Sequence, residues 1–147
     1  WWSENISKDW LDIRSQTYGI LQREDTLKEI VKLLGPEALP DEEKLILEVA
    51  RMIKIGILQQ NSFDDVDTYC SPEKQFKLMK LQVDFYNQGQ QALKDGASLA
   101  DIRSMDVISL LLKARMDVKD DEMDKLDKIG NDMVEQFKSI TGVQIQN

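Results

Sequence analysis

The amino-acid sequence predicts an all-α protein folded as a helical bundle of about five helices. Hydrophobic residues recur with the 3.6-residue period of helices and nowhere with the two-residue period of strands. Only three prolines and seven glycines interrupt the 147 residues. Leu, Ile, Lys, Glu and Asp far outnumber Val and Thr, a balance that favours helix. At this length we expect residues 1–147 to form a single domain with one hydrophobic core.

The first predicted helix covers residues 7–34. Gly19 and the polar stretch 24–26 weaken its middle, so the segment is either one bent helix or two. It ends at Gly35-Pro36, because glycine readily caps a helix and proline cannot continue one. The apolar residues that recur at helical spacing along it are Trp10, Ile13, Ile20, Leu27, Ile30, Val31 and Leu34.

The second predicted helix covers residues 41–60 and opens with Pro40-Asp41-Glu42-Glu43. Proline suits the first turn of a helix, and carboxylates there face the positive end of the helix dipole. Apolar residues cover nearly the whole surface, as in a helix enclosed by others on several sides. We therefore expect this helix to be the hub of the bundle. One narrow stripe is polar and consists of Lys44, Glu48, Arg51 and Lys54.

Three further segments complete the predicted bundle. One covers residues 71–93 and presents an apolar face. The next begins after Ser98, where Asp101 resembles the second half of a capping box, and Met105-Asp106 are a candidate interruption within it. The last covers residues 120–141, with a seam suited to lie along another helix. The apolar face consists of Phe76, Met79, Val83 and Tyr86, and the seam of Met123, Leu126, Gly130, Met133, Phe137 and Ile140.

Composition excludes several classes of partner. The net charge of −8, from 19 basic and 27 acidic residues, would repel nucleic acid and anionic lipid. A run of about 18 apolar residues, the minimum for a membrane-spanning helix, does not occur. The single cysteine cannot form an internal disulfide, which fits a reducing compartment.

The residue types also exclude most catalytic and metal sites. Without histidine, the sequence cannot build Ser-His-Asp or Cys-His catalysis, an imidazole zinc site or a ferritin-like di-iron centre. The aspartates of residues 64–67 do not match a calcium loop, because Cys70 stands where glycine is required and Phe76 where glutamate is required. Acidic neighbours disfavour the Cys70 thiolate as a nucleophile. A phosphate-binding GxxxxGK[ST] loop is also missing, so we expect neither a catalytic residue nor a metal ligand in this chain.

The segment QQNSFDDVDTYCSPEKQ, residues 59–75, leaves one candidate binding feature. It joins two predicted helices and carries Phe63 and Tyr69 among acidic residues. Two interpretations stay open on the residues alone. Both rings either pack into the core and anchor the loop, or line a pocket for a flat ligand.

Two adjoining stretches carry a family resemblance. GPEALPDEEKLILEVARMIK, followed by LQQNSFDDVDTYCSPEKQ, resembles the C-terminal helical domain of the catalytic A subunit (alpha chain) of archaeal A-type and vacuolar-type rotary ATPases. The similarity extends from Lys8 to the final helix, is strongest between Gly35 and Gln75, and is weak beyond Gly96. The form is closer to archaeal and bacterial members than to eukaryotic vacuolar ones.

The resemblance implies a parent subunit with an upstream nucleotide-binding domain that holds ATP or ADP with Mg²⁺. In the family, three such subunits alternate with three B subunits around a central stalk and couple ATP turnover to proton or sodium transport. The chain begins at Trp1 without Met, as expected for a piece of such a subunit. The parent would be an ion-translocating ATPase in a peripheral complex on the cytoplasmic face of a membrane. The fragment alone is expected to be inactive and to bind no nucleotide tightly.

The resemblance also assigns roles to two sets of residues. The family aromatics that approach adenine correspond to Phe63 and Tyr69. The acidic helix-turn-helix that pushes on the stalk corresponds to the turn from Pro36 to Glu43, and the predicted stalk contacts are Glu37, Asp41, Glu42 and Glu43. The residues alone favour a solvated turn whose carboxylates cap the second helix, because exposed charge runs are common. The alternative function is a free-standing helical module that binds a partner helix.

Overall fold

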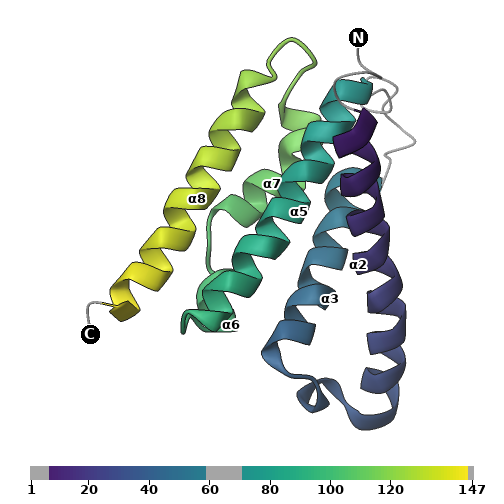
Figure 1. The fold of residues 1–147 in the computed structure, drawn as a ribbon, viewed down its shortest axis with the longest axis vertical. Coiled ribbons are helices and arrows are strands. Elements are labelled where there is room, and N and C mark those ends of the chain that lie inside the picture. The colour runs from purple at the N-terminus through teal and green to yellow at the C-terminus, as the bar shows by residue number, and fades with distance from the viewer. Residues whose placement is uncertain (1–6, 59–70, 146–147) are drawn as a thin grey trace.

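The computed structural model describes residues 7–58 and 71–145, which are mostly helical and contain no strand. This confirms the all-α bundle of about five helices, to which one short helix and two single turns are added. Figure 1 shows the long helices running alongside one another. In chain order the elements are α2 (Ser7–Leu34), the 3₁₀ turn η1 (Pro36–Ala38), α3 (Asp41–Ile53), the π-helical turn η2 (Lys54–Leu58), α5 (Pro72–Lys94), α6 (Leu99–Arg103), α7 (Val107–Asp117) and α8 (Asp124–Ile145).

Helix α2 is one continuous helix, which decides between the two alternatives that the sequence left open. It packs against α3 and α5 and buries Ile13, Ile20 and Leu27. Thr17 is buried in the same row, and its hydroxyl donates to the carbonyl oxygen of Ile13 at 2.8 Å. A polar side chain therefore lies in the core without an unsatisfied donor.

Helix α3 ends at Ile53, and the π-helical turn η2 carries the chain on to Leu58, close to the predicted end at residue 60. A Cβ added at Gly56 would lie 3.0 Å from the backbone oxygen of Leu111. Helix α7 can approach this turn closely because residue 56 has no side chain. The buried residues of α3 are Leu45, Ile46, Val49, Ala50, Met52 and Ile53.

Helix α5 shares the central position that the sequence predicted for α3 alone. It packs against α2, α3, α7 and α8, and it buries residues on more than the one predicted face. The ring of Phe85 lies 5.3 Å, centroid to centroid, from that of Phe137 in α8. Phe76, Met79 and Val83 of the predicted face are buried, and so are Leu78, Leu81, Gln82 and Phe85.

The fourth predicted helix is divided, as anticipated, into α6 and α7. The predicted capping box is present, because Ser98 Oγ accepts from the Asp101 amide at 3.0 Å and Asp101 Oδ2 accepts from the Ser98 amide at 3.2 Å. Residues 104–106 separate the two helices. The Val107 amide then donates to Gln136 Oε1 of α8 at 2.9 Å, which ties the start of α7 to α8.

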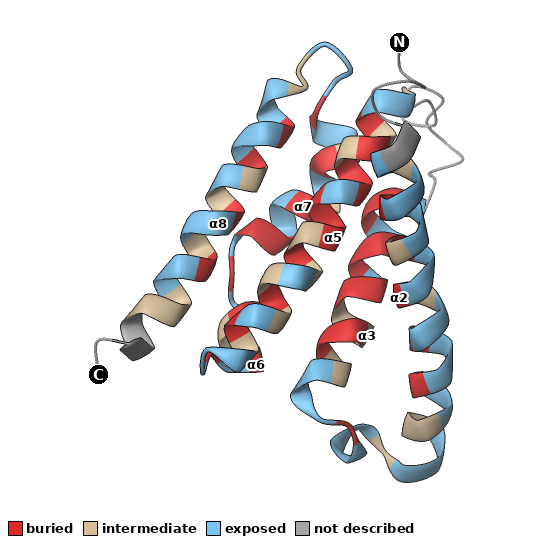
Figure 2. Ribbon diagram, in the orientation of Figure 1, coloured by how far each residue is buried: buried red, intermediate tan, exposed pale blue. Residues whose placement is uncertain are grey.

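Helix α8 begins at Asp124 and ends at Ile145, both later than the predicted bounds of 120 and 141. Its seam is confirmed where Leu126, Met133 and Phe137 are buried against α5 and α7. Figure 2 shows buried residues on the facing sides of the helices and exposed residues on the outer sides.

Candidate functional site: the tip of the α2–α3 hairpin

A tight turn joins α2 to α3 at one end of the bundle. Gly35 has φ 86° and ψ 161°, a backbone conformation that is essentially restricted to glycine. Its amide donates to the Val31 carbonyl oxygen at 2.8 Å and closes the last turn of α2. Leu39 is buried and anchors the turn to the core, and α3 begins directly after Pro40. The turn is thus held by backbone geometry and one apolar contact.

The four predicted stalk-contact residues divide into two pairs. Glu37 forms an ion pair with Lys44 at 3.4 Å, and Glu43 forms one with Arg23 at 2.9 Å. Asp41 and Glu42 lie exposed in the first turn of α3, and neither has an ion-pair partner among the described residues. Glu37 is also open to solvent, with 91% of its side chain exposed. Three of the four carboxylates therefore face outward, and Glu43 braces α3 against α2.

Two leucines at the same tip were missed by sequence reasoning. Leu33 and Leu34 are 82% and 72% exposed, although the helical spacing had placed Leu34 with the core residues. The spacing prediction was wrong here because the hairpin projects beyond α5 and α6, so the last turn of α2 has no helix beside it on that side (Figure 1). Leu33 and Leu34 are the two most exposed large hydrophobic residues among those that the structure describes. We call Leu33, Leu34, Glu37, Asp41 and Glu42 the hairpin tip.

Phe63 and Tyr69, the predicted adenine contacts, lie outside the described residues, as does Cys70. The structure does describe the elements on either side of residues 59–70. Arg115 Nη1 donates to the Ile57 carbonyl oxygen at 3.5 Å, and Lys74 Nζ donates to the Arg115 carbonyl oxygen at 2.8 Å. Helix α7 therefore contacts both the turn before the segment and the helix after it. Lys74 is 4% exposed, so this contact is part of the core.

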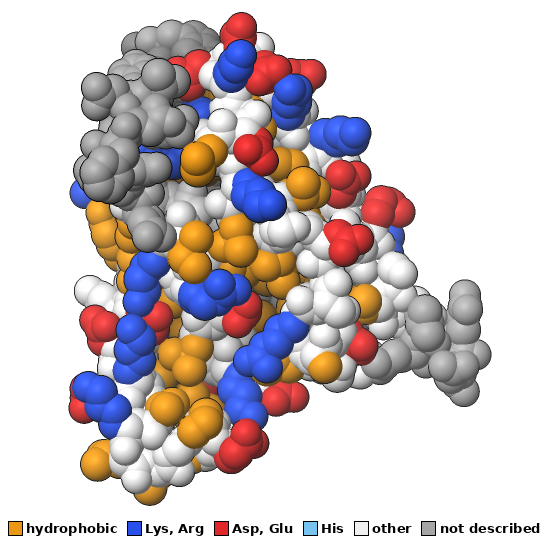
Figure 3. All heavy atoms as spheres, turned by 180° about the vertical axis from the view of Figure 1, so that it is seen from behind, with side chains coloured by type: hydrophobic (Ala, Val, Ile, Leu, Met, Phe, Trp, Pro, Cys, Tyr) orange, Lys and Arg blue, Asp and Glu red, His pale blue; other side chains and the backbone are white. Residues whose placement is uncertain are grey.

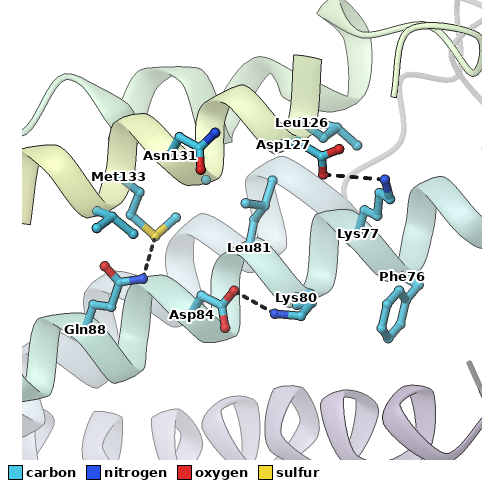
Figure 4. A pocket seen from close by; sticks show the side chains of 12 residues that line it. Phe76, Lys77, Lys80, Leu81, Asp84, Gln88, Leu126, Asp127, Asn131 and Met133 are labelled. Atoms are coloured by element: carbon cyan, nitrogen blue, oxygen red, sulfur yellow. Dashed lines mark hydrogen bonds and ion pairs between the residues drawn. The ribbon is translucent and has the colours of Figure 1, made fainter. Parts of the chain in front are cut away.

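A hollow between α5 and α8 is a packing groove. It has a volume of about 460 Å³ and a floor that includes Leu81, Leu126 and Met133. Figure 4 shows its rim, where Lys77 pairs with Asp127 at 3.5 Å and Lys80 pairs with Asp84 at 3.0 Å. Because the rim charges already satisfy one another, the groove does not present a convergent set of groups for a ligand.

Two further classes of site are missing from the part of the chain that the structure describes. Acidic and cysteine side chains do not gather there in a group that could hold a metal ion. Over the same residues, each helix is too short or too polar to cross a bilayer.

The family follows from sequence comparison. The model of a family described as the C-terminal domain of V and A type ATP synthase matches residues 1–103, more than two thirds of this chain. The chain belongs to this family.

Curated relatives of this chain include A subunits of A-type ATP synthases. This chain is 44% identical over 142 residues to the A subunit of Hyperthermus butylicus, a match that covers 95% of this chain and 24% of the relative. The protein of the same name from Ignicoccus hospitalis is 42% identical over 143 residues, covering 96% and 24%. That of Staphylothermus marinus is 49% identical over 105 residues, covering 71% and 18%. The chain spans about a quarter of the length of the curated relatives it matches.

Proposed function

We propose that this chain is the C-terminal domain of the catalytic A subunit of an A/V-type ATP synthase, and that its hairpin tip bears on the central stalk. The observation that carries the proposal is the exposure of Leu33 and Leu34 at 82% and 72%. Exposed leucines at a projecting end suit a second apolar surface that moves past them.

The hairpin behind the tip has the form of a stiff lever. Helix α2 is continuous over 28 residues, about 42 Å at 1.5 Å per residue. It is braced by packing against α3 and α5 and, near the tip, by the Arg23–Glu43 pair at 2.9 Å. In the proposed mechanism a shift of the whole bundle displaces the tip, which presses on the stalk through its bulk. Exposed charges contribute little to this, because single exposed ion pairs are worth only about 0–1 kcal/mol.

The nucleotide is held mainly outside this chain in the proposal. ATP or ADP with Mg²⁺ occupies an upstream nucleotide-binding domain, and Phe63 and Tyr69 add a stacking wall on the adenine side. Three such subunits alternate with three B subunits around the stalk. The complex is peripheral, on the cytoplasmic face of a membrane, and couples ATP turnover to proton or sodium transport. The reading frame tests this directly, because a GxxxxGK[ST] segment must lie upstream of Trp1, whereas a free-standing interaction module requires none.

A rotation assay on the assembled complex tests the tip. The double variant Leu33→Ser with Leu34→Ser should lower the torque of ATP-driven rotation while assembly stays normal, because the stalk loses its apolar bearing surface. The matched control is Leu110→Ser with Met116→Ser, which replaces residues of α7 that are 41% and 59% exposed. Unchanged torque in the tip variant, or an equal loss in the control, would contradict the proposed role.

Steady-state kinetics test the adenine contacts. Stacking of a base on an aromatic ring is worth about 1–3 kcal/mol, and about 1.4 kcal/mol is a factor of ten. In the assembled complex, Phe63→Ala should therefore raise KM for ATP by about tenfold, with a smaller change in kcat, since adenine binding is nearly uniform along the reaction. An unchanged KM in both Phe63→Ala and Tyr69→Ala would favour the core-anchor interpretation. The chain alone should melt cooperatively and hydrolyse no ATP.

A further inference from the structure

Two adjoining hollows lie beside α3, one between α3 and α2 and the other reaching Glu37 of the hairpin tip and Arg103 of α6, and neither is lined by Leu33 or Leu34. Their volumes are about 540 and 350 Å³, and they share Leu47 and Arg51. They adjoin at these two residues, and we call the two hollows together the basic groove. Its charged lining consists of Lys28, Lys32, Lys44, Arg51, Lys54, Arg103, Glu24, Glu37 and Glu48.

Two carboxylates in the basic groove are each bridged by two cations, and of these Glu24 is buried and Glu48 partly buried. Glu24 pairs with Lys54 at 2.6 Å and with Lys28 at 3.7 Å. Glu48 pairs with Arg51 at 2.8 Å and with Arg103 at 3.9 Å. Each cluster thus carries one excess positive charge.

The charges of these clusters differ in how far they reach into solvent. The side chains of Glu24 and Glu48 are only 6% and 16% exposed, whereas the four bridging cations are 42–52% exposed. The hydrogen bond that Lys54 Nζ donates to the Glu24 carboxylate raises the pKa of the Lys54 ammonium above its ordinary 10.5, so this cation stays charged at neutral pH. At these two clusters the cations therefore reach solvent and the carboxylates lie beneath them, whereas Glu37 at the end of the groove is a lining carboxylate that stays exposed, at 91%.

The basic groove also has an apolar floor, and its cations stand out in an acidic chain. Val31, Leu47 and Ile55 line the groove between the charges, and Ile55 is 41% exposed. Figure 3 shows hydrophobic side chains exposed between groups of Lys and Arg over α2 and α3. Six cations and three carboxylates line the groove, in a chain whose net charge is −8. The polar stripe of the second helix, noticed in the sequence, is one wall of this feature.

From this arrangement we propose that the basic groove is a docking site for an acidic amphipathic helix of another protein chain. The apolar floor takes the hydrophobic stripe of the incoming helix, and the exposed lysines and arginines pair with acidic residues on either side of that stripe. Helices pack by fitting the side-chain ridges of one into the grooves of another, so a groove beside packed helices suits a further helix. A nucleic acid would match the cations but not the apolar floor. The proposal does not depend on contact between the hairpin tip and the stalk.

A peptide-binding measurement on the 147-residue chain tests this. The probe is a fluorescein-labelled peptide of about 18 residues, with leucines at i, i+3, i+4 and i+7 and glutamates at the flanking positions. A second peptide carries lysine at every glutamate position. We expect fluorescence anisotropy to show the acidic peptide binding at least about tenfold more tightly, with an affinity that falls as NaCl is raised.

Pairs of variants, one inside the basic groove and one outside it at equal exposure, test whether the peptide binds in the groove. Lys32→Glu should weaken binding of the acidic peptide about tenfold, whereas Lys138→Glu should not. Both lysines are 71% exposed and both pair with a glutamate three residues earlier, but only Lys32 lines the groove. Ile55→Ser should likewise weaken binding relative to Leu110→Ser, since both residues are 41% exposed.

Three results would contradict the proposed docking site. Undetectable binding of the acidic peptide, equal affinities for the two peptides, or equal losses in Lys32→Glu and Lys138→Glu would overturn the proposal. Circular dichroism verifies that each variant is folded. Should Ile55→Ser unfold, the surface pair Lys32→Glu and Lys138→Glu still decides the question.

Discussion

The two ends of α3 are constructed in opposite ways. At its N-terminal end a short turn exposes Leu33 and Leu34 at 82% and 72%, beside carboxylates that face solvent. At its C-terminal end the chain passes into the π-helical turn Lys54–Leu58, where Gly56 is buried and α7 approaches closely. Lys74 of α5, which contacts α7 near this end, is only 4% exposed, although Lys54 in the turn keeps 42% of its side chain in solvent.

Because of this difference, residues at one end of the hairpin determine the stability of the domain, and residues at the other end are available to contact a partner. Groups at the buried end contact several neighbours, so a change there alters the free energy of unfolding. Groups at the tip contact solvent, so a change there leaves stability nearly constant and affects only what the tip touches. Since exposed leucines gain nothing from the chain's own core, their presence at the tip is the stronger pointer to a partner.

The largest contrast should come from truncating one apolar residue at each end. Met52 is fully buried in α3, and Met52→Ala should lower the free energy of unfolding by about 2–5 kcal/mol, from lost burial and the cavity it leaves. Leu34→Ala should change it by less than about 0.5 kcal/mol. Urea unfolding followed by circular dichroism measures both. Similar losses in the two variants would show that the tip packs against the rest of the domain.

Much of the fold could be predicted because helix periodicity is a local signal. The spacing of Ile13, Ile20 and Leu27 and the Ser98–Asp101 capping box both appear in the structure as anticipated. The π-helical turn could not be predicted, because Lys54–Leu58 continues the apolar pattern of α3 without a break. Its geometry depends on the approach of Leu111, which is distant in the sequence.

The site was less predictable than the fold, because its properties depend on residues that are distant in the sequence. The acidic residues of the turn were identified from a resemblance, but the exposure of Leu34 depends on where neighbouring helices end. The sequence predicted that Glu24 weakens the middle of the first helix, yet its side chain is buried and forms an ion pair with Lys54 at 2.6 Å. Burial of that carboxylate requires a cation on another helix, and a pattern within one helix cannot reveal it.

The turn itself offers the next largest effect. Gly35→Ala should destabilise the chain by about 1–3 kcal/mol, because φ 86° with ψ 161° is strained for any residue with a Cβ. Space is not the cause, since nothing lies within 4 Å of a Cβ at this position. Thermal unfolding of Gly35→Ala gives the cost. A neutral result would mean that the turn relaxes freely, and the hairpin tip would then be less rigid than a lever requires.

A glycine pair sharpens the comparison at the buried end. Gly56→Ala places a Cβ 3.0 Å from the Leu111 backbone oxygen. Overpacking costs about 1–3 kcal/mol, partly offset by the preference of helices for alanine of about 1 kcal/mol, so a net loss of about 0–2 kcal/mol is expected. Gly19 has nothing within 4 Å of its added Cβ, so Gly19→Ala should stabilise α2 by about 0.4–1 kcal/mol. A gain in both variants would show that α7 does not constrain the π-helical turn.

The smallest effects should come from neutralising single carboxylates near the tip. Glu43 pairs with Arg23 at 2.9 Å, with side chains 23% and 51% exposed. Solvent screening limits the loss in Glu43→Gln to about 0–1 kcal/mol. Glu42→Gln should be silent in unfolding experiments, because Glu42 has no ion-pair partner among the described residues. In the assembled complex both variants should keep ATP-driven rotation nearly intact, since the proposed lever acts through bulk. A Glu42→Gln variant that assembled normally but lost its torque would show that charge, and not the apolar pair beside it, is what the stalk contacts.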